Sequence, residues 1–274
     1  MKTFALALGA GGARGLAHIA VFEALDELGL KPVAIAGSSI GALAGAAYAA
    51  GMTGRGLRHH VLGLAHNPGE VWRRLMLARA GKIGDLFGGD FSAAMRLDPE
   101  KLCEQFLPDA IPAEFGALGI PLSVIASDLY GRREVVYSAG PLRPALASSI
   151  ALPTIMRPVV IDDRVLIDGG ATNPLPFDLL RGRADVILAV EISGPPDLDR
   201  TGVPNVIEAM YATVLVMTSS IIAEKLKRET PDLLLQPKVG TFRTLDFFQA
   251  SAILRSAEPV KAELKHKLQA LLHD

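Results

Sequence analysis

The strongest constraint on the fold is the alternation of strand-length apolar runs with helical patterns. A first run, Thr3–Leu8, is followed by the helical pattern Leu16–Leu28, and a second, Val33–Ala36, by the helical pattern Ile40–Ala50. Runs that are apolar throughout are typical of strands buried on both faces of a parallel sheet. The alternation therefore predicts an α/β fold: a three-layer α/β/α domain with a mostly parallel central sheet.

The rest of the chain extends this pattern. Further strands are predicted at Leu122–Ala126, Glu134–Tyr137, Val159–Ile161, Val165–Ile167 and Val186–Glu191, and a short apolar run follows at Leu233–Leu235. The pair Asp162 and Asp163 separates two of these runs and predicts a hairpin, so the sheet is expected to be mixed. Residues 52–108 carry helical patterns, punctuated by glycine and proline, without a convincing strand. We expect a single domain, 1–274, in which this region is a lid-like helical insertion over the active site.

A candidate nucleophile lies between the second predicted strand and its helix. Residues 37–41 read Gly-Ser-Ser-Ile-Gly, a G-x-S-x-G sequence in the strand–turn–helix context that a nucleophile elbow requires. Glycines at Gly37 and Gly41 would prevent collisions of side chains with neighbouring backbone, and the spacing selects Ser39 over Ser38. The alternative is an ordinary tight turn in which Ser39 only caps the helix.

A glycine-rich loop follows the first predicted strand. Residues 9–15 read Gly-Ala-Gly-Gly-Ala-Arg-Gly. Arg14 stands where a dinucleotide-binding fingerprint needs glycine, and no Gly-Lys-Ser/Thr completes a P-loop. What remains is a set of backbone N–H groups at a helix N-terminus, which binds negative charge. In acyl transfer that charge is the oxyanion of the tetrahedral intermediate; phosphate or nucleotide binding is the alternative.

A serine nucleophile also needs a base. No motif supports any of the six histidines, which are His18, His59, His60, His66, His266 and His273. The better candidate is Asp168, which ends an apolar run and precedes two glycines, where partial burial would raise its basicity. The alternative is that Asp168 only forms a turn. Asp128, at the end of another predicted strand, is the second choice.

These three elements together resemble the patatin-like phospholipase family. They stand in the family's order as GAGGARG, GSSIG and DGG, and the stretches ASDLYGRREVVYSAG and SSIALPTIMRPV are also similar to the family. The resemblance covers at least Phe4 to Pro176, and the bacterial, stand-alone form of the family would account for the whole length. The sequence departs from the pattern at Ala10, where many members have glycine.

The resemblance implies a Ser–Asp dyad that works without histidine. Ser39 would be the nucleophile and Asp168 the base. The backbone N–H groups of Gly11, Gly12 and Ala13 would form the oxyanion hole, with Arg14 supporting that loop. The implied function is a serine acyl hydrolase of the esterase, lipase or phospholipase type that cleaves lipid-like carboxylic esters. The alternative is a lipid-binding or regulatory protein with weak or no catalysis on the same fold; a nucleotide-binding oxidoreductase is disfavoured by Arg14.

The composition limits which classes of partner and which kinds of site we expect. The net charge of −1 gives no attraction to nucleic acid, and the single cysteine, Cys103, excludes an internal disulfide and a multi-cysteine zinc site. We expect no cofactor and no metal. A reducing compartment fits, so the expected location is cytoplasmic, with peripheral contact at a membrane left open. We expect a first strand at the N-terminus instead of a signal peptide, and no transmembrane span in the uncharged stretch from Pro32 to Gly54.

Two segments offer contact surfaces. The stretch Val71–Arg79 mixes bulky apolar and cationic side chains around Trp72, the only tryptophan. It is either a lid helix packed over the cleft or a segment at a lipid interface. The C-terminal helical pattern from Pro259 to Leu272 is expected to dock on the domain or in a contact between two copies of the chain.

Overall fold

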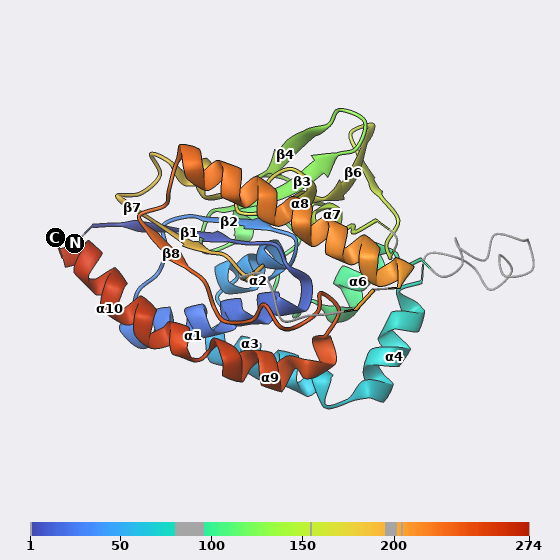
Figure 1. Cartoon of the computed structure of the whole chain (residues 1–274), viewed down its shortest axis with the longest axis horizontal. Coiled ribbons are helices and arrows are strands. Elements are labelled where there is room, and N and C mark those ends of the chain that lie inside the picture. Colours follow the sequence, from blue (N-terminus) through green and yellow to red (C-terminus); the bar gives the residue numbers. More distant parts are fainter. Residues whose placement is uncertain (1, 80–95, 154, 195–201, 204, 274) are drawn as a thin grey trace, which may run out of the picture.

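A mixed eight-stranded sheet forms the middle layer of the part of the chain that the computed structural model describes, residues 2–79, 96–153, 155–194, 202–203 and 205–273 (Figure 1). Five strands are parallel and lie in the order β3 (Leu122–Asp128), β2 (Ile35–Ser38), β1 (Phe4–Leu8), β7 (Val186–Val190) and β8 (Leu233–Leu235). Antiparallel pairing adds β4 (Arg133–Tyr137), β6 (Arg164–Asp168) and β5 (Val159–Ile161) around β3. The expected mostly parallel, mixed sheet is confirmed.

Both faces of the sheet are covered. One face packs against α1 (His18–Leu28), α2 (Ile40–Ala49), α7 (Leu142–Ser149), α9 (Ala250–Ala257) and α10 (Pro259–His273). The other face packs against Phe177–Leu180 and against α8 (Val206–Arg228), which crosses the sheet in Figure 1. In β1 the large side chains Phe4, Leu6 and Leu8 point to the first face and Ala5 and Ala7 to the second. This alternation explains why the chain builds three layers.

Strand β3 sets the relative position of two segments that are distant in sequence. Its residues 124–128 pair with β4 along one edge, so β2 and β6 must share the other edge. Along that edge Ser38 is aligned with Ile125, and Asp168 with Ala126. The carboxyl ends of β2 and β6 therefore lie opposite neighbouring residues of β3.

The predicted strands agree with the structure within two residues at their ends. β2 begins at Ile35 and runs to Ser38, so the strand itself enters the G-x-S-x-G sequence. Between β5 and β6, Asp162 and Asp163 both have positive φ angles, 49° and 61°, which is the two-residue type I′ hairpin turn. The last predicted helical pattern forms α10, which packs mainly on α1.

The insertion, 52–108, consists of helices in its described part. α3 (Gly54–Ala65) packs on α1, α4 (Pro68–Leu77) on α3 and α6, and α6 (Pro99–Phe106) on α7. Residues 80–95 of this region lie outside the described residues. Thr53 and Asn67 cap α3 and α4 by accepting backbone N–H groups, which explains where these helices begin. The insertion thus extends the helical layer on one side of the sheet.

Candidate active site

The turn from β2 into α2 holds Ser39 in a strained backbone conformation. Its φ and ψ angles are 55° and −124°, a region that costs a non-glycine residue about 1–3 kcal/mol. A Cβ atom at position 37 would lie 2.6 Å from the carbonyl oxygen of Gly41, and one at position 41 would lie 2.3 Å from that of Leu8. Both glycines are therefore required by close backbone approach. Ser38 is fully buried in β2, whereas Ser39 faces the cavity.

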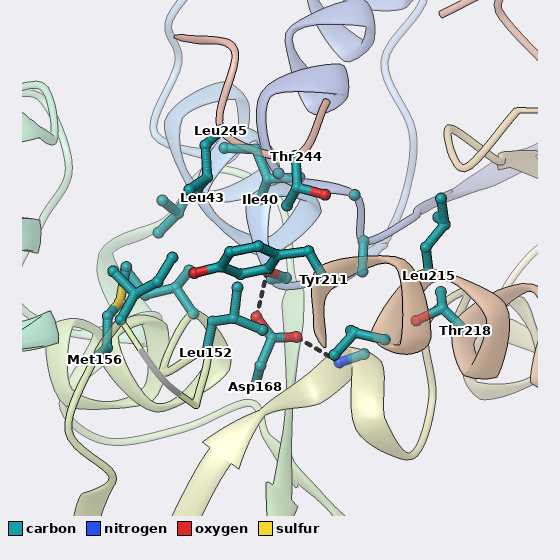
Figure 2. A pocket seen from close by; sticks show the side chains of 18 of the residues that line it. Ile40, Leu43, Leu152, Met156, Asp168, Tyr211, Leu215, Thr218, Thr244 and Leu245 are labelled. Atoms are coloured by element: carbon teal, nitrogen blue, oxygen red, sulfur yellow. Dashed lines mark hydrogen bonds between the residues drawn. The ribbon is translucent and has the colours of Figure 1, made fainter. Parts of the chain in front are cut away.

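Asp168 ends β6 and meets Ser39 directly. The Ser39 hydroxyl donates to Asp168 Oδ2 at 2.6 Å, and the Gly170 amide donates to Oδ1 at 2.7 Å, as the dashed lines in Figure 2 mark. Gly169 allows this approach, because a Cβ atom there would lie 2.2 Å from the Ile125 carbonyl oxygen. The two residues that the sequence singled out as nucleophile and base are therefore in contact.

Burial makes the Asp168 carboxylate more basic. Desolvation raises the pKa of Asp168 to about 6, although the hydrogen bonds from Ser39 and Gly170 act in the opposite direction. At neutral pH the carboxylate is still mostly ionised, so it can accept a proton. The Asp168 carboxylate is therefore a proton acceptor of useful basicity. It is hydrogen-bonded to the hydroxyl of Ser39, which lies at the N-terminus of α2.

Ser149, at the end of α7, contacts Ser39 from the other side. Its hydroxyl accepts the Ser39 N–H at 2.9 Å, and its side chain is fully buried. This bond satisfies the amide of the strained residue. Ser149 belongs to the stretch SSIALPTIMRPV that resembles the family, which is a sequence signal for this position but not for its contact with Ser39.

The glycine-rich loop lies next to the dyad. Gly11 and Gly12 line the same cavity as Ser39, and their amides donate to no protein group among the described residues. Gly12 has a φ angle of 61°, and a Cβ atom there would lie 2.3 Å from the Thr244 carbonyl oxygen. Ala10 does not have a positive φ, so the departure from the family pattern introduces no strain.

Two members of the predicted loop have other partners. The Ala13 amide donates to the Thr244 carbonyl at 2.8 Å, so this donor is not available to a substrate oxygen in this structure, which corrects the prediction for Ala13. The buried Arg14 guanidinium donates to the carbonyl oxygens of Ser193 and Phe242. Desolvation lowers the pKa of Arg14, but a guanidinium stays charged in proteins. Arg14 thus fastens the loop to two other segments, as expected of a supporting residue.

His18, the first residue of α1, also holds this loop. Burial lowers the pKa of His18 to about 4, so the ring is neutral, and its Nε2–H donates to the Gly9 carbonyl at 3.0 Å. No histidine lines the cavity among the described residues. Asp128 does not line it either, and its carboxylate accepts the Gly131 amide of its own turn. The other proposed bases are therefore not placed near Ser39.

The dyad lies in a cavity of about 180 Å³ with mostly apolar walls. Apolar side chains come from α2, α6, the segment after α7 and α8, and they include Ile40, Leu43, Leu102, Ile150, Leu152, Ile155, Met156, Val214 and Leu215. In Figure 2, Leu152 and Met156 lie on one side of Asp168, and Leu215 and Thr218 on the other. An acyl chain is the kind of group that such walls accept.

The cover of this cavity comes mainly from segments that the sequence did not single out. α8 contributes Tyr211 and three further lining residues, and the segment after β8 contributes Thr244, Leu245 and Phe247. From the described part of the insertion only Leu102 reaches the cavity, and α4 contributes nothing to it. Trp72 in α4 is exposed, and the lid-like role of the insertion stays a prediction.

Within the described residues no cluster of three or more histidine, cysteine, aspartate or glutamate side chains is arranged to hold a metal ion. One described helix, α8, is long and apolar enough to cross a membrane by length and composition alone.

Comparison with known proteins identifies a family and several relatives. The family model described as patatin-like phospholipase matches residues 6–181. An uncharacterized NTE family protein of Mycobacterium tuberculosis is 39% identical over 191 residues, which are 69% of this chain and 49% of that protein. Lysophospholipase nte1 of Aspergillus fumigatus is 26% identical over 72% of this chain and 12% of its own length. The chain spans about half the length of the first curated relatives that it matches.

Among solved structures, VipD from Legionella pneumophila aligns with 97% of this chain and 66% of its own length, with a TM-score of 0.53 and 16% sequence identity. This similarity supports the fold.

Proposed function

Because the chain belongs to the patatin-like phospholipase family, we propose that it is a serine acyl hydrolase that cleaves lipid-like carboxylic esters through Ser39 and Asp168. The observation that carries the proposal is the 2.6 Å hydrogen bond from the Ser39 hydroxyl to the Asp168 carboxylate at the head of an apolar cavity. The raised pKa of Asp168 supports its role as base.

The chemistry proceeds in two halves. Asp168 takes the Ser39 proton while Ser39 Oγ attacks the ester carbonyl carbon, and the amides of Gly11 and Gly12 bind the resulting oxyanion. The intermediate collapses to an acyl-enzyme, and the alcohol leaves with the proton held by Asp168. Water then gives a proton to Asp168 and attacks the acyl-enzyme, which releases the carboxylic acid and returns the proton to Ser39.

The substrate class follows from the cavity and the family. Apolar walls favour an acyl chain over a polar acyl group, and a relative bears the name lysophospholipase. We propose fatty acyl esters of the phospholipid, lysophospholipid or acylglycerol type. Hydrolysis measured across a panel of acyl lengths and head groups will rank them.

A test of the dyad needs two variants. Ser39→Ala removes the nucleophile, and Asp168→Asn removes the base but retains a carbonyl oxygen that can accept the Gly170 amide. Both should be labelled by a fluorophosphonate probe far less than the wild type, and ester hydrolysis should fall by a factor of about 10³ or more. Circular dichroism checks that both variants are folded. Unchanged hydrolysis in Ser39→Ala would overturn the proposal.

The same experiment distinguishes the proposed hydrolase from a lipid-binding protein without catalysis. Such a protein would bind an acyl ligand but would show neither probe labelling nor ester hydrolysis in the wild type. The intact hydrogen bond between Ser39 and Asp168 supports the enzyme.

A further inference from the structure

Large apolar side chains are exposed along the outward face of α8, and the exposed Thr213 and Ser220 hydroxyls on this helix bond back to the Ala209 and Val216 carbonyls. Val206, Met210, Val214 and Met217 recur at helical spacing, and each side chain is between 42% and 77% exposed. Residues 209–223 of the helix contain no charged side chain. A helix on the surface of a domain ordinarily exposes polar residues on this side, so this face has a composition suited to an apolar partner.

Exposed apolar residues also lie across the cavity from α8. Leu245, Phe247 and Phe248 are between 43% and 60% exposed, and Leu245 and Phe247 line the cavity as well. Val214 on α8 is likewise both exposed and part of the cavity wall. The apolar wall of the cavity therefore continues outward onto the protein surface on both sides. We call the seven residues Val206, Met210, Val214, Met217, Leu245, Phe247 and Phe248 the apolar rim.

The inward face of α8 fastens the helix to the domain. Thr218 and Ile222 are buried, and the Lys225 ammonium bonds to Asp178, to the Asn173 side chain and to the Leu175 carbonyl. A helix that crossed a bilayer would have to give up these bonds, and an isolated lysine is costly there. α8 is thus suited to lie along an interface and not to span one.

We propose that the apolar rim binds the surface of a lipid aggregate, a bilayer or a micelle, from which the ester enters the cavity. This inference rests on the proposed function, because it assigns the source of that substrate. Continuity with the cavity favours lipid: the rim presents the same chemistry as the wall that accepts the acyl chain. The stretch 209–223 also carries no charged side chain, so it offers a protein partner no ion pair.

The binding arm uses the full chain with Ser39→Ala, so that vesicles are not consumed. Met210→Glu, Met217→Glu and Phe248→Glu are combined, since none of these residues lines the cavity. Flotation with phosphatidylcholine vesicles should show a partition coefficient at least about tenfold lower than that of the unmodified rim. The matched control is Val33→Glu, a 41% exposed apolar residue before β2, at the opposite end of that strand from Ser39.

The activity arm uses the same rim variant with Ser39 intact. Hydrolysis of a monomeric soluble ester, such as p-nitrophenyl butyrate, should stay within about twofold, whereas hydrolysis of an ester embedded in vesicles should fall about tenfold, in parallel with binding. If the wild type hydrolyses neither substrate but still binds vesicles through the rim, the proposed function fails and the rim assignment stands.

Several results would overturn the rim assignment. One is unchanged vesicle binding by the rim variant. Another is a loss confined to Trp72→Ala, which would move the contact to α4. A third is binding only to anionic vesicles and only at low salt, which would indicate attraction by cationic side chains. Light scattering covers the remaining alternative: a dimer that the rim variant abolishes, without vesicle binding, would make the face a contact between two copies of this chain.

Discussion

Ser39 and Asp168 come from segments 129 positions apart, yet their side chains share one hydrogen bond. Each residue has a local reason for its place: Ser39 occupies a turn that Gly37 and Gly41 permit, and Asp168 ends a strand next to Gly169. The residue types and glycine spacing are visible in the sequence. The bond itself depends on the alignment of β2 and β6 along β3, which no local pattern encodes.

The pH dependence of the reaction tests the role of Asp168. The base must be ionised to accept a proton, and its pKa is raised to about 6. We therefore expect kcat/KM for a soluble ester to rise about tenfold per pH unit below pH 6 and to level off above it. A profile measured from pH 4.5 to 8.5 will show this limb, and a profile that is flat between pH 5 and 7 would contradict the assignment.

Ser149 is predicted to position the nucleophile without touching the substrate. Ser149→Ala leaves the Ser39 amide without its acceptor, so the strained turn loses its support, and kcat should fall about tenfold while KM changes little. Ser149→Thr keeps a hydroxyl and should recover most of kcat. The control is Ser148→Ala, because among the described residues the Ser148 hydroxyl bonds to the Ala145 carbonyl of its own helix and not to Ser39. Equal effects of Ser148→Ala and Ser149→Ala would indicate a general packing role.

At the scale of elements, the predicted strands and the helices that follow β1 and β2 are present. This success has a physical cause: strands buried on both faces leave unbroken apolar runs, and the tight turns between elements leave glycines. The cover of the cavity was not predicted, because α8 carries apolar residues on both its inward and outward sides and its pattern does not reveal which side faces the site. The insertion was expected there instead, yet in its described part only Leu102 reaches the cavity.

Two glycine substitutions separate a required glycine from a dispensable one. Gly41→Ala in α2 places a methyl group 2.3 Å from the Leu8 carbonyl oxygen, and we expect it to lower the free energy of unfolding by about 2 kcal/mol or more. Gly63→Ala in α3 meets no atom within 4 Å and should raise that free energy by about 0.5–1 kcal/mol, because alanine is the better helix former. Urea unfolding of both variants gives the comparison. A neutral Gly41→Ala would mean that β1 and α2 can separate without cost.

At the scale of the whole molecule, burial of the Asp168 carboxylate carries a cost in stability. The folded Asp168 carboxyl holds its proton up to about pH 6, whereas an unfolded aspartate ionises near pH 4. The cost of keeping the charge buried therefore appears as pH rises from 4 to 6 and is fully present above 6. By linkage it amounts to about 3 kcal/mol for a shift of about two pH units.

Asp168→Asn should consequently be more stable than the wild type at pH 8 and equally stable near pH 4. His18 also titrates, in the opposite sense: its folded pKa of about 4 removes stability as pH falls below about 6.5. Since His18 is present in both proteins, its contribution cancels in the difference between them. Urea unfolding at both pH values measures that difference in the free energy of unfolding. An equal gain in stability at pH 4 and pH 8 would contradict an electrostatic origin of the effect.

The two ends of the described chain meet far from the cavity. The Lys2 amide donates to the Leu272 carbonyl at 3.3 Å, and both ends lie beside the start of β1 (Figure 1). Ser39, in contrast, follows the carboxyl end of the parallel strand β2. A chain joined to either end would leave the domain on the side opposite the cavity. A domain fused at either end is therefore expected to leave the cavity uncovered.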